Sequence, residues 1–519
     1  MAEMKEGEAY TLLHYFESKQ YENPSFFYEI QLDVENQITN IFWADAKMVV
    51  DYFYFGDMVS FDTTYRTNRH LRPFAPFVGF NHHRQTVTFG AALLYDETSE
   101  SFEWLFRTFM KAMCGKKPTT IFTDQDPAMA KAIAKVFPES YHRLCAWHLS
   151  QNACKHINHV YKKSDSFASD FKGCICDFEY EDDFLNAWES MLDKYDLRQN
   201  KWLQDLFEKR EKWASVYGRH AFCAGATITQ LSESFNGRLR GYMKPTLNVL
   251  GFFRNFERLI EDMRYKELEE NYEMSQAMPP LNLDVLLLKN ARESYTRAIF
   301  LRVKKEYEKS CNILFKECNQ VSKIFEYKVC VMGDMGDHKV TFNSEDETVE
   351  CSCKKYEFVG ILCCHALRVL NLWNKLVIPS RYILKRWSKH ARSGCVIDNS
   401  GRIIKEDPKL DVSNRFKDLC RIAVDISSKA AESDDATNFL AKKFVELVVE
   451  VEKILGKSSS IANQQNVSET IATSEKDAFQ AKGLKKKEGV SRVKGRPKSC
   501  LEKKSKRKRH QEKPSSTLH

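Results

Sequence analysis

Four residues of the types that bind zinc lie close together near position 360. Cys351 and Cys353 are one residue apart, and after a spacer Cys363 and His365 are again one residue apart. Three thiolates and one imidazole match the closed tetrahedral site in which proteins hold a structural zinc ion. The spacing therefore predicts one structural Zn²⁺ bound by these four residues. A chance cluster of core cysteines is the alternative, and Cys364 could replace Cys363 as a ligand.

Carboxylates at apolar segments form a second candidate site. Asp62 lies within the apolar run 58–66. Asp124 ends the run 119–124, and Glu233 precedes a helical stretch. Buried carboxylates cost free energy unless they are paired or bind a cation. If the two runs are neighbouring strands, the three acids could meet at one sheet edge and hold two divalent cations for phosphoryl transfer on nucleic acid. Ordinary strand-end and N-cap acids are the alternative.

The last 39 residues are strongly basic. Residues 481–519 carry 15 Lys and Arg against three Glu, a local charge of +12 in a chain of net charge +8, which leaves −4 for the rest. Lys494 and Lys498 flank a Gly-Arg-Pro core that contains Arg496 and resembles an AT-hook, which binds the minor groove. A second basic cluster is typical of nuclear import signals and consists of Lys503, Lys504, Lys506, Arg507, Lys508 and Arg509. The tail predicts a nuclear protein that meets DNA and an import receptor. A solvated tail that serves import alone is the alternative.

Composition excludes several other classes of protein. No run of 18 apolar residues occurs, so we expect no membrane contact through a spanning helix. The first ten residues, MAEMKEGEAY, lack the apolar stretch of a secretory signal. The 16 cysteines are therefore expected in a reducing compartment, as buried thiols or metal ligands and not as disulfides.

Apolar periodicity predicts the elements that position these residues. An α/β sheet with helices on its faces is expected between residues 57 and 150. The expected strands are 58–66, 74–81, 86–95, 119–124 and 141–149, and the expected helices are 101–113 and 127–137. Later helices are expected at 246–272, 281–310 and 365–373, and later strands at 323–332 and 338–353.

The same pattern predicts a division of the chain into seven parts. They comprise an N-terminal remnant, a first α/β part, a helical insertion, the end of the core with further helices, a zinc-finger region, a helical pair and a disordered basic tail. The corresponding ranges are 1–45, 46–150, 151–230, 231–310, 320–395, 405–456 and 457–519.

Many ordered sequence blocks resemble one known family. The blocks DMVSFDTTYRTN, NHH, TDQDPAM, HRLCAWHL and QLSESFNGRL resemble the core of Mutator-like transposases. Together with GFFRNFERLIEDMR, the cysteine–histidine cluster and YILKRWSKHA, they are similar to the plant far-red-impaired-response family of transcription factors, which derive from such transposases. The resemblance covers roughly residues 45–395. It implies an α/β RNase-H-like transposase core with a large all-α insertion, then a small zinc-bound ββα SWIM finger and a helical, then disordered, tail.

The resemblance also implies roles for individual residues. Asp62, Asp124 and Glu233 occupy the positions of the acidic triad, which we expect to be vestigial, with no transposase activity. Cys145 and His148 fall on the C-x-x-H motif that Mutator-like transposases carry between the second Asp and the Glu. Two ligands do not close a metal site, so this pair is expected to serve in the core or in a helper role.

Family members usually begin with a zinc-dependent DNA-binding module, and this chain is expected to lack it. Only about 45 residues precede the first block, and they contain no cysteine. Arg84 also stands where the family pattern favours glycine. The expected function is a nuclear zinc-binding regulator of DNA-templated transcription in light-controlled development, which forms homo- or heterodimers with family members. The alternatives are an active DDE-type transposase or nuclease and a dimerisation partner of full-length relatives that does not bind DNA.

Overall fold

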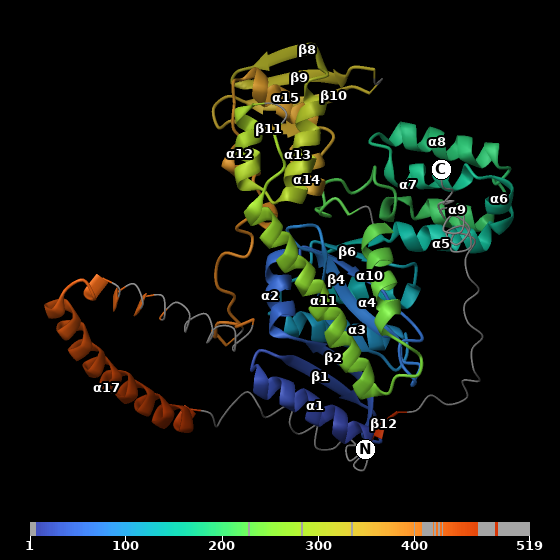
Figure 1. The fold of residues 1–519 in the computed structure, drawn as a ribbon. Coiled ribbons are helices and arrows are strands. Elements are labelled where there is room, and N and C mark those ends of the chain that lie inside the picture. Colours follow the sequence, from blue (N-terminus) through green and yellow to red (C-terminus); the bar gives the residue numbers. More distant parts are fainter. Residues whose placement is uncertain are drawn as a thin grey trace, which may run out of the picture. The chain divides into compact units, whose positions relative to one another are not determined.

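The computed structural model describes residues 7–226, 229–281, 284–333, 336–398, 400–406, 429–465 and 483–485, with a few isolated positions between 419 and 427. The chain divides into two compact units (Figure 1). The smaller unit joins residues 1–47 to residues 397–485, and the larger unit contains residues 48–396. The predicted AT-hook and import signal lie outside the described residues. Within the described part, no helix is long and apolar enough to cross a membrane.

The smaller unit contains regular structure in a region that sequence analysis treated as a remnant. Helix α1 (Glu8–Glu22) is followed by the antiparallel hairpin of β1 (Phe27–Leu32) and β2 (Gln37–Ala44). Strand β12 (Gly483–Leu484) adds to β2 in parallel. A long helix, α17 (Asp434–Gln465), occupies part of the expected helical pair. The residues of α1 that are buried lie at helical spacing, which explains its amphipathic sequence: Ala9, Leu12, Leu13 and Phe16.

A run of five neighbouring strands forms the core of the larger unit. Its strand order is β5-β4-β3-β6-β7, with β3, β4 and β5 antiparallel and β3, β6 and β7 parallel. The strands are β3 (Met58–Phe61), β4 (Phe74–Phe80), β5 (Thr86–Leu93), β6 (Thr120–Thr123) and β7 (Tyr141–Leu144). Every residue of β4 and β5 is buried, which explains their nearly continuous apolar sequences.

Three helices accompany this sheet: α2 (Ala46–Phe55), α3 (Ser99–Ala112) and α4 (Pro127–Val136). Helix α3 packs its aromatic stripe on the strands, and the rings of Phe109 and Phe77 stack 4.0 Å apart. Helix α4 begins where Asp126 accepts the Met129 amide and proline takes the first helical position.

The expected strand 141–149 changes into a helix halfway along. Strand β7 ends at Leu144, and α5 (Ala146–His156) begins directly after it. Cys145 marks the change, because its amide still bonds to Thr123 of the neighbouring strand while its carbonyl accepts the first helical bond from Leu149. Helices α6 (Asn158–Lys163), α7 (Phe167–Cys176), α8 (Glu181–Lys194) and α9 (Lys201–Glu208) complete a helical block.

Four helices and a second sheet follow. The helices are α10 (Thr229–Tyr242), α11 (Val249–Gln276), α12 (Leu286–Ser294) and α13 (Arg297–Ser310). The sheet has the antiparallel order β11-β10-β9-β8 and consists of β8 (Ile313–Val321), β9 (Ile324–Val331), β10 (His338–Asn343) and β11 (Thr348–Cys351). Helices α14 (Lys355–Val359) and α15 (Cys364–Leu372) come next.

The zinc-finger region is thus larger than the predicted ββα unit. The expected strand 338–353 is a hairpin of β10 and β11, because Glu347 adopts a left-handed conformation (φ 60°) and Asp346 accepts the Thr348 amide. Strand β8 was not predicted. Its residues are mostly exposed, so the alternation that marks a strand with one buried face is missing from its sequence.

Candidate metal centre and carboxylate edge

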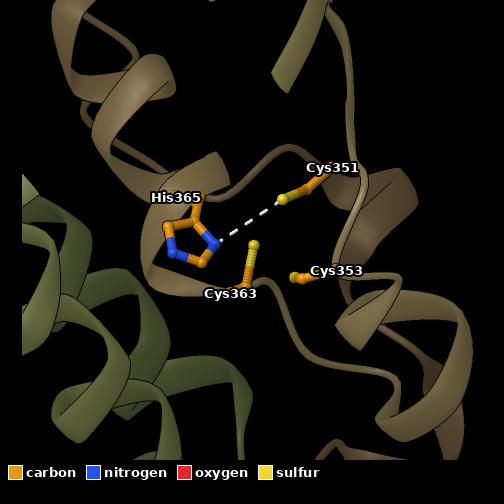
Figure 2. Close-up of side chains that lie close together, drawn as sticks. All are labelled: Cys351, Cys353, Cys363 and His365. Carbon is orange, nitrogen blue, oxygen red and sulfur yellow. Dashed lines mark hydrogen bonds between the residues drawn. The ribbon is translucent and has the colours of Figure 1, made fainter. Parts of the chain in front are cut away.

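The four predicted zinc ligands meet at one point of the larger unit. Cys351 ends β11, and Cys353 follows in the turn after it. Cys363 caps α15, where its sulfur accepts the Ala366 amide, and His365 lies in the first turn of that helix. Their ligand atoms all lie within 4.8 Å of one another, and all four residues are buried (Figure 2). A strand end and a helix start therefore each supply one ligand pair.

The distances and charges of this cluster suit a metal ion. Cys351 Sγ lies 3.6 Å from His365 Nδ1, close to the separation of about 3.6 Å that follows from Zn–S and Zn–N bonds in a tetrahedron. Hydrogen bonds from Cys351 and Cys363 lower the pKa of the Cys353 thiol and favour its thiolate, whereas hydrogen bonds among the same thiols raise the pKa values of Cys351 and Cys363. The ring of His338 stacks on that of His365 at 3.8 Å and limits its rotation. The donor set fits one structural zinc ion.

Cys364, the alternative ligand, is not part of the described metal-binding group. Its backbone amide donates to Glu306 Oε2 at 3.0 Å. Glu306 comes from α13, is almost fully buried, and also forms an ion pair with Lys355 at 2.7 Å. An anchored helix start keeps Cys363 and His365 on the metal side, because consecutive helical residues point in different directions.

Asp62 and Asp124 lie at the same edge of the core sheet. Asp62 follows β3 and Asp124 follows β6, and these strands are parallel neighbours with Ser60 opposite Phe122. The carboxyl ends of parallel neighbours lie side by side, so the two acids lie at one edge of the sheet. The strand expected at 58–66 ends at Phe61, so Asp62 follows it and does not lie within it. We call this place the carboxylate edge.

Two further side chains reach Asp62. His148 Nε2 lies 3.2 Å from Asp62 Oδ2, and Asn236 of α10 donates to the same oxygen at 3.4 Å. Position 233 lies in α10 one turn before Asn236, but the Glu233 side chain is outside the described part of the structure. His148 is a predicted motif residue, but its contact with Asp62 was not predicted, and Asn236 is not among the predicted site residues.

The charges at the carboxylate edge are linked. Burial opposes a charge on His148, yet the Asp62 carboxylate and then Cys145 outweigh it and raise the pKa of His148 well above its usual value. Burial raises the pKa of Asp124, the charge of His148 opposes that rise, and the neighbouring Asp62 adds to it. A charged His148 therefore neutralises part of the negative charge that two adjacent carboxylates create.

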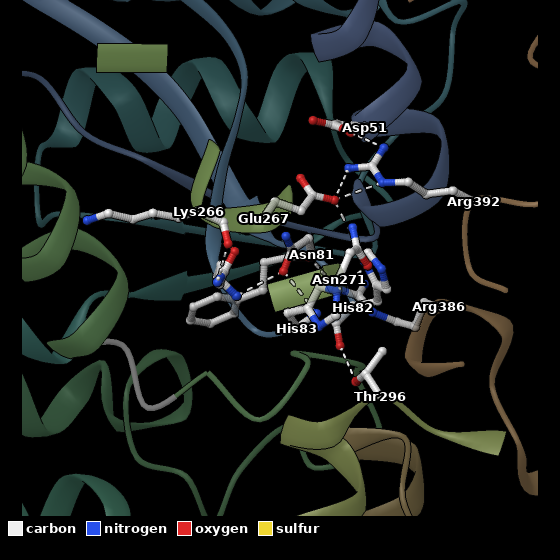
Figure 3. A network of polar contacts seen from close by, with 12 residues as sticks. Asp51, Asn81, His82, His83, Lys266, Glu267, Asn271, Thr296, Arg386 and Arg392 are labelled. Carbon is white, nitrogen blue, oxygen red and sulfur yellow. Dashed lines mark hydrogen bonds and ion pairs between the residues drawn. The ribbon is translucent and has the colours of Figure 1, made fainter. Parts of the chain in front are cut away.

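A buried network that sequence analysis missed surrounds the turn between β4 and β5 (Figure 3). Arg392 pairs with Asp51 of α2 and donates to Glu267 of α11 at 2.7 Å. His82 lies 4.0 Å from the same Glu267 carboxylate, and His83 Nε2 is 2.8 Å from Asn271. The NHH block was a signal that polar residues matter here, but its partners are more than 180 residues away in sequence.

The chain matches two sequence families. Residues 58–152 match the MULE transposase domain, and residues 330–374 match the SWIM zinc finger. The first match contains Asp62, Asp124 and His148, and the second contains all four zinc ligands. The two centres described above therefore lie one in each matched domain.

Three relatives from Arabidopsis thaliana show the extent of the similarity. Protein FAR1-RELATED SEQUENCE 5 is 39% identical over 76% of this chain and 50% of its own length. Protein FAR-RED IMPAIRED RESPONSE 1 is 32% identical over 85% of this chain and 53% of its own length. Protein FAR1-RELATED SEQUENCE 9 is 33% identical over 73% of this chain and 70% of its own length. The chain spans about half the length of the first two relatives.

Proposed function

The chain belongs to the FAR-RED IMPAIRED RESPONSE 1 family of proteins derived from Mutator-like transposases, and on this basis we propose that it is a nuclear, zinc-binding regulator of DNA-templated transcription. The observation that supports this proposal most strongly is the similarity to FAR1-RELATED SEQUENCE 9, which extends over 70% of that protein. The name of one relative refers to a response to far-red light. Light-controlled development is the process in which we propose that this chain acts.

The strand arrangement supports the proposal of an RNase-H-like core. Strands β3, β4 and β5 form an antiparallel meander, and β6 and β7 add in parallel beside β3. Acids that follow β3 and β6 stand where this fold would place a carboxylate pair.

A DDE-type nuclease is the second candidate function, and the proximity of Asp62 and Asp124 favours it. Two carboxylates at one sheet edge have the chemistry to bind divalent metal and activate phosphoryl transfer. The contacts of Asp62 with His148 and Asn236 support the first candidate, since they already satisfy an oxygen that a metal would need. We propose that the triad is not catalytic.

The experiment is chromatin recovery of the full chain, expressed as a fluorescent fusion in plant cells without its full-length relatives. We expect nuclear fluorescence and recovery with chromatin that weakens as salt rises, because phosphate contacts release counterions. A control with alanine at the six basic positions from 503 to 509 should remain cytoplasmic. A nuclear protein that never associates with chromatin would establish the alternative, a dimerisation partner that does not bind DNA.

A strand-nicking assay separates the regulator from the nuclease. The purified chain and its Asp62→Ala variant are incubated with supercoiled DNA and Mg²⁺ or Mn²⁺. We expect no cleavage by either protein. Metal-dependent nicking by the wild type that disappears in Asp62→Ala would replace the proposed function with an enzymatic one.

A further inference from the structure

The residues that connect the helical block to α10 are held from two sides. We call residues 219–226 the linker segment. On the core side, Thr120 of β6 donates to the Phe222 carbonyl at 2.7 Å. Arg84 donates to the carbonyls of Ala224 and Gly225, the latter at 3.0 Å. These bonds attach the linker segment to the sheet that carries Asp124.

On its other side, the linker segment lies against the zinc finger. The contacts come from Cys353 and from residues 354–362, which separate the two ligand pairs and which we call the spacer. The Cys223 amide donates to the Phe358 carbonyl at 2.9 Å. Arg219 Nε donates at 2.7 Å to the carbonyl of Cys353, itself a zinc ligand. The finger therefore touches the linker segment with both a ligand residue and the spacer.

The packing at this contact leaves no room for even one added carbon. A Cβ on Gly225 would lie 2.9 Å from a methyl carbon of Val359, and Gly225 also has a positive φ of +60°. On the opposite side of the contact, a Cβ on Gly360 would lie 2.5 Å from Leu384 and 3.0 Å from the Phe222 ring. Glycines at close backbone approaches mark a contact that depends on the shape of the spacer.

We propose that zinc turns the spacer into a docking surface for the linker segment, so that zinc occupancy at the finger controls the position of α10 at the carboxylate edge. The two ligand pairs stand at the two ends of the spacer, so a bound ion closes it into a loop and removes its conformational freedom. Helix α10 follows the linker segment and brings Asn236 to Asp62. The inference depends on the zinc site and is independent of whether the chain regulates transcription.

Hydrogen–deuterium exchange of the full chain tests this coupling, with zinc bound and after its removal by a chelator. We expect amides in the linker segment, the Cys223 amide first, to exchange at least tenfold faster without zinc, while β3 and β4 keep their protection. Faster exchange confined to residues 338–373, with the linker segment unchanged, would overturn the proposal. Amide exchange reports the protection of the backbone, so the experiment does not require an assay of the protein's activity.

A variant with zinc present tests the reverse direction. Coupling between two sites is reciprocal, so weakening the docking must weaken the retention of zinc. Arg219→Gln removes the charged donor to Cys353, and we expect zinc to transfer to a colorimetric chelator about tenfold faster, the scale of a charge-assisted hydrogen bond. Arg198→Gln is the matched control, because Arg198 lies outside the linker segment and its ion pairs in the described structure are with exposed carboxylates of the helical block.

Removal of zinc by a chelator could unfold the whole chain, and the exchange experiment would then not test the coupling. Arg219→Gln tests it with zinc still bound. Arg219→Gln with the zinc-release rate of the wild type and of Arg198→Gln would show that the finger holds its metal independently of the linker segment. That result contradicts the proposal. Faster release in Arg219→Gln alone supports it.

Discussion

Cys363 and Cys364 are adjacent residues of the same type, but only one belongs to the metal centre. We predict that Cys363→Ala loses the zinc ion, because it removes one of four ligands from a closed site. Cys364→Ala should retain one zinc per chain and lose only about 1 kcal/mol of stability, the worth of a small buried group. Metal analysis of the purified full chains measures both. Equal loss of zinc in the two variants would mean that the ligand assignment is wrong.

Arg84 adopts a left-handed backbone conformation that favours glycine, and its side chain makes hydrogen bonds that glycine could not make. The family pattern favours glycine there, and the structure explains why, since the residue has a φ of 59° in the turn after β4. The arginine side chain compensates by donating to two carbonyls of the linker segment. Burial lowers the pKa of Arg84 to about 10, which leaves it charged at neutral pH. The arginine that replaces the expected glycine thus connects the turn after β4 to the linker segment.

At the scale of elements, His142 on β7 makes the stability of the folded chain depend on pH. Burial, and then the charge of Lys212, lower the pKa of His142 on this strand to about 4, and its Nε2 lies 2.8 Å from the Thr123 hydroxyl. The unfolded chain binds a proton near pH 6.5 and the folded chain does not. The stability contributed by neutral His142 is therefore present above pH 6.5 and is lost as the pH falls toward 4.

We predict that His142→Gln reduces this pH dependence. Relative to the variant, the wild type should lose about 2–3 kcal/mol of unfolding free energy between pH 7 and pH 4. Urea denaturation of both proteins across this range measures it, and subtraction of the two curves removes the titration of all other groups. Parallel curves would show that His142 takes up its proton in the folded state as readily as in the unfolded chain.

At the scale of the larger unit, Arg392 connects three distant parts of the sequence. Its partners, Asp51 and Glu267, are 3% and 4% exposed. We predict that Arg392→Ala lowers the unfolding free energy by about 3–5 kcal/mol, since it leaves two buried carboxylates without their cation. Arg198→Ala, which breaks two exposed ion pairs, should lower the unfolding free energy far less. Denaturation midpoints measure both, and equal losses of unfolding free energy would show that the ion pairs of Arg392 with Asp51 and Glu267 do not stabilise the larger unit.

Much of both centres could be predicted from sequence because the signals are local. The C-x-C and C-x-H pairs identify zinc ligands through spacing alone, and Asp62 within one apolar run and Asp124 at the end of another predict acids at a sheet edge. The helices α3 and α4 follow from periodicity and capping residues in the same way. Each of these signals is contained within about 15 residues, where the geometry of a strand or helix translates spacing into position.

Tertiary structure alone decided how the four-residue zinc cluster is connected to the rest of the chain. The sequence determined that Cys351, Cys353, Cys363 and His365 would bind zinc, yet nothing in their spacing shows that the spacer between them packs on residues 219–226. The pairing of His148 with Asp62 and of Arg392 with Glu267 was equally hidden. Such contacts depend on which faces meet after folding, and the type of a residue does not identify a partner that lies far away in the sequence.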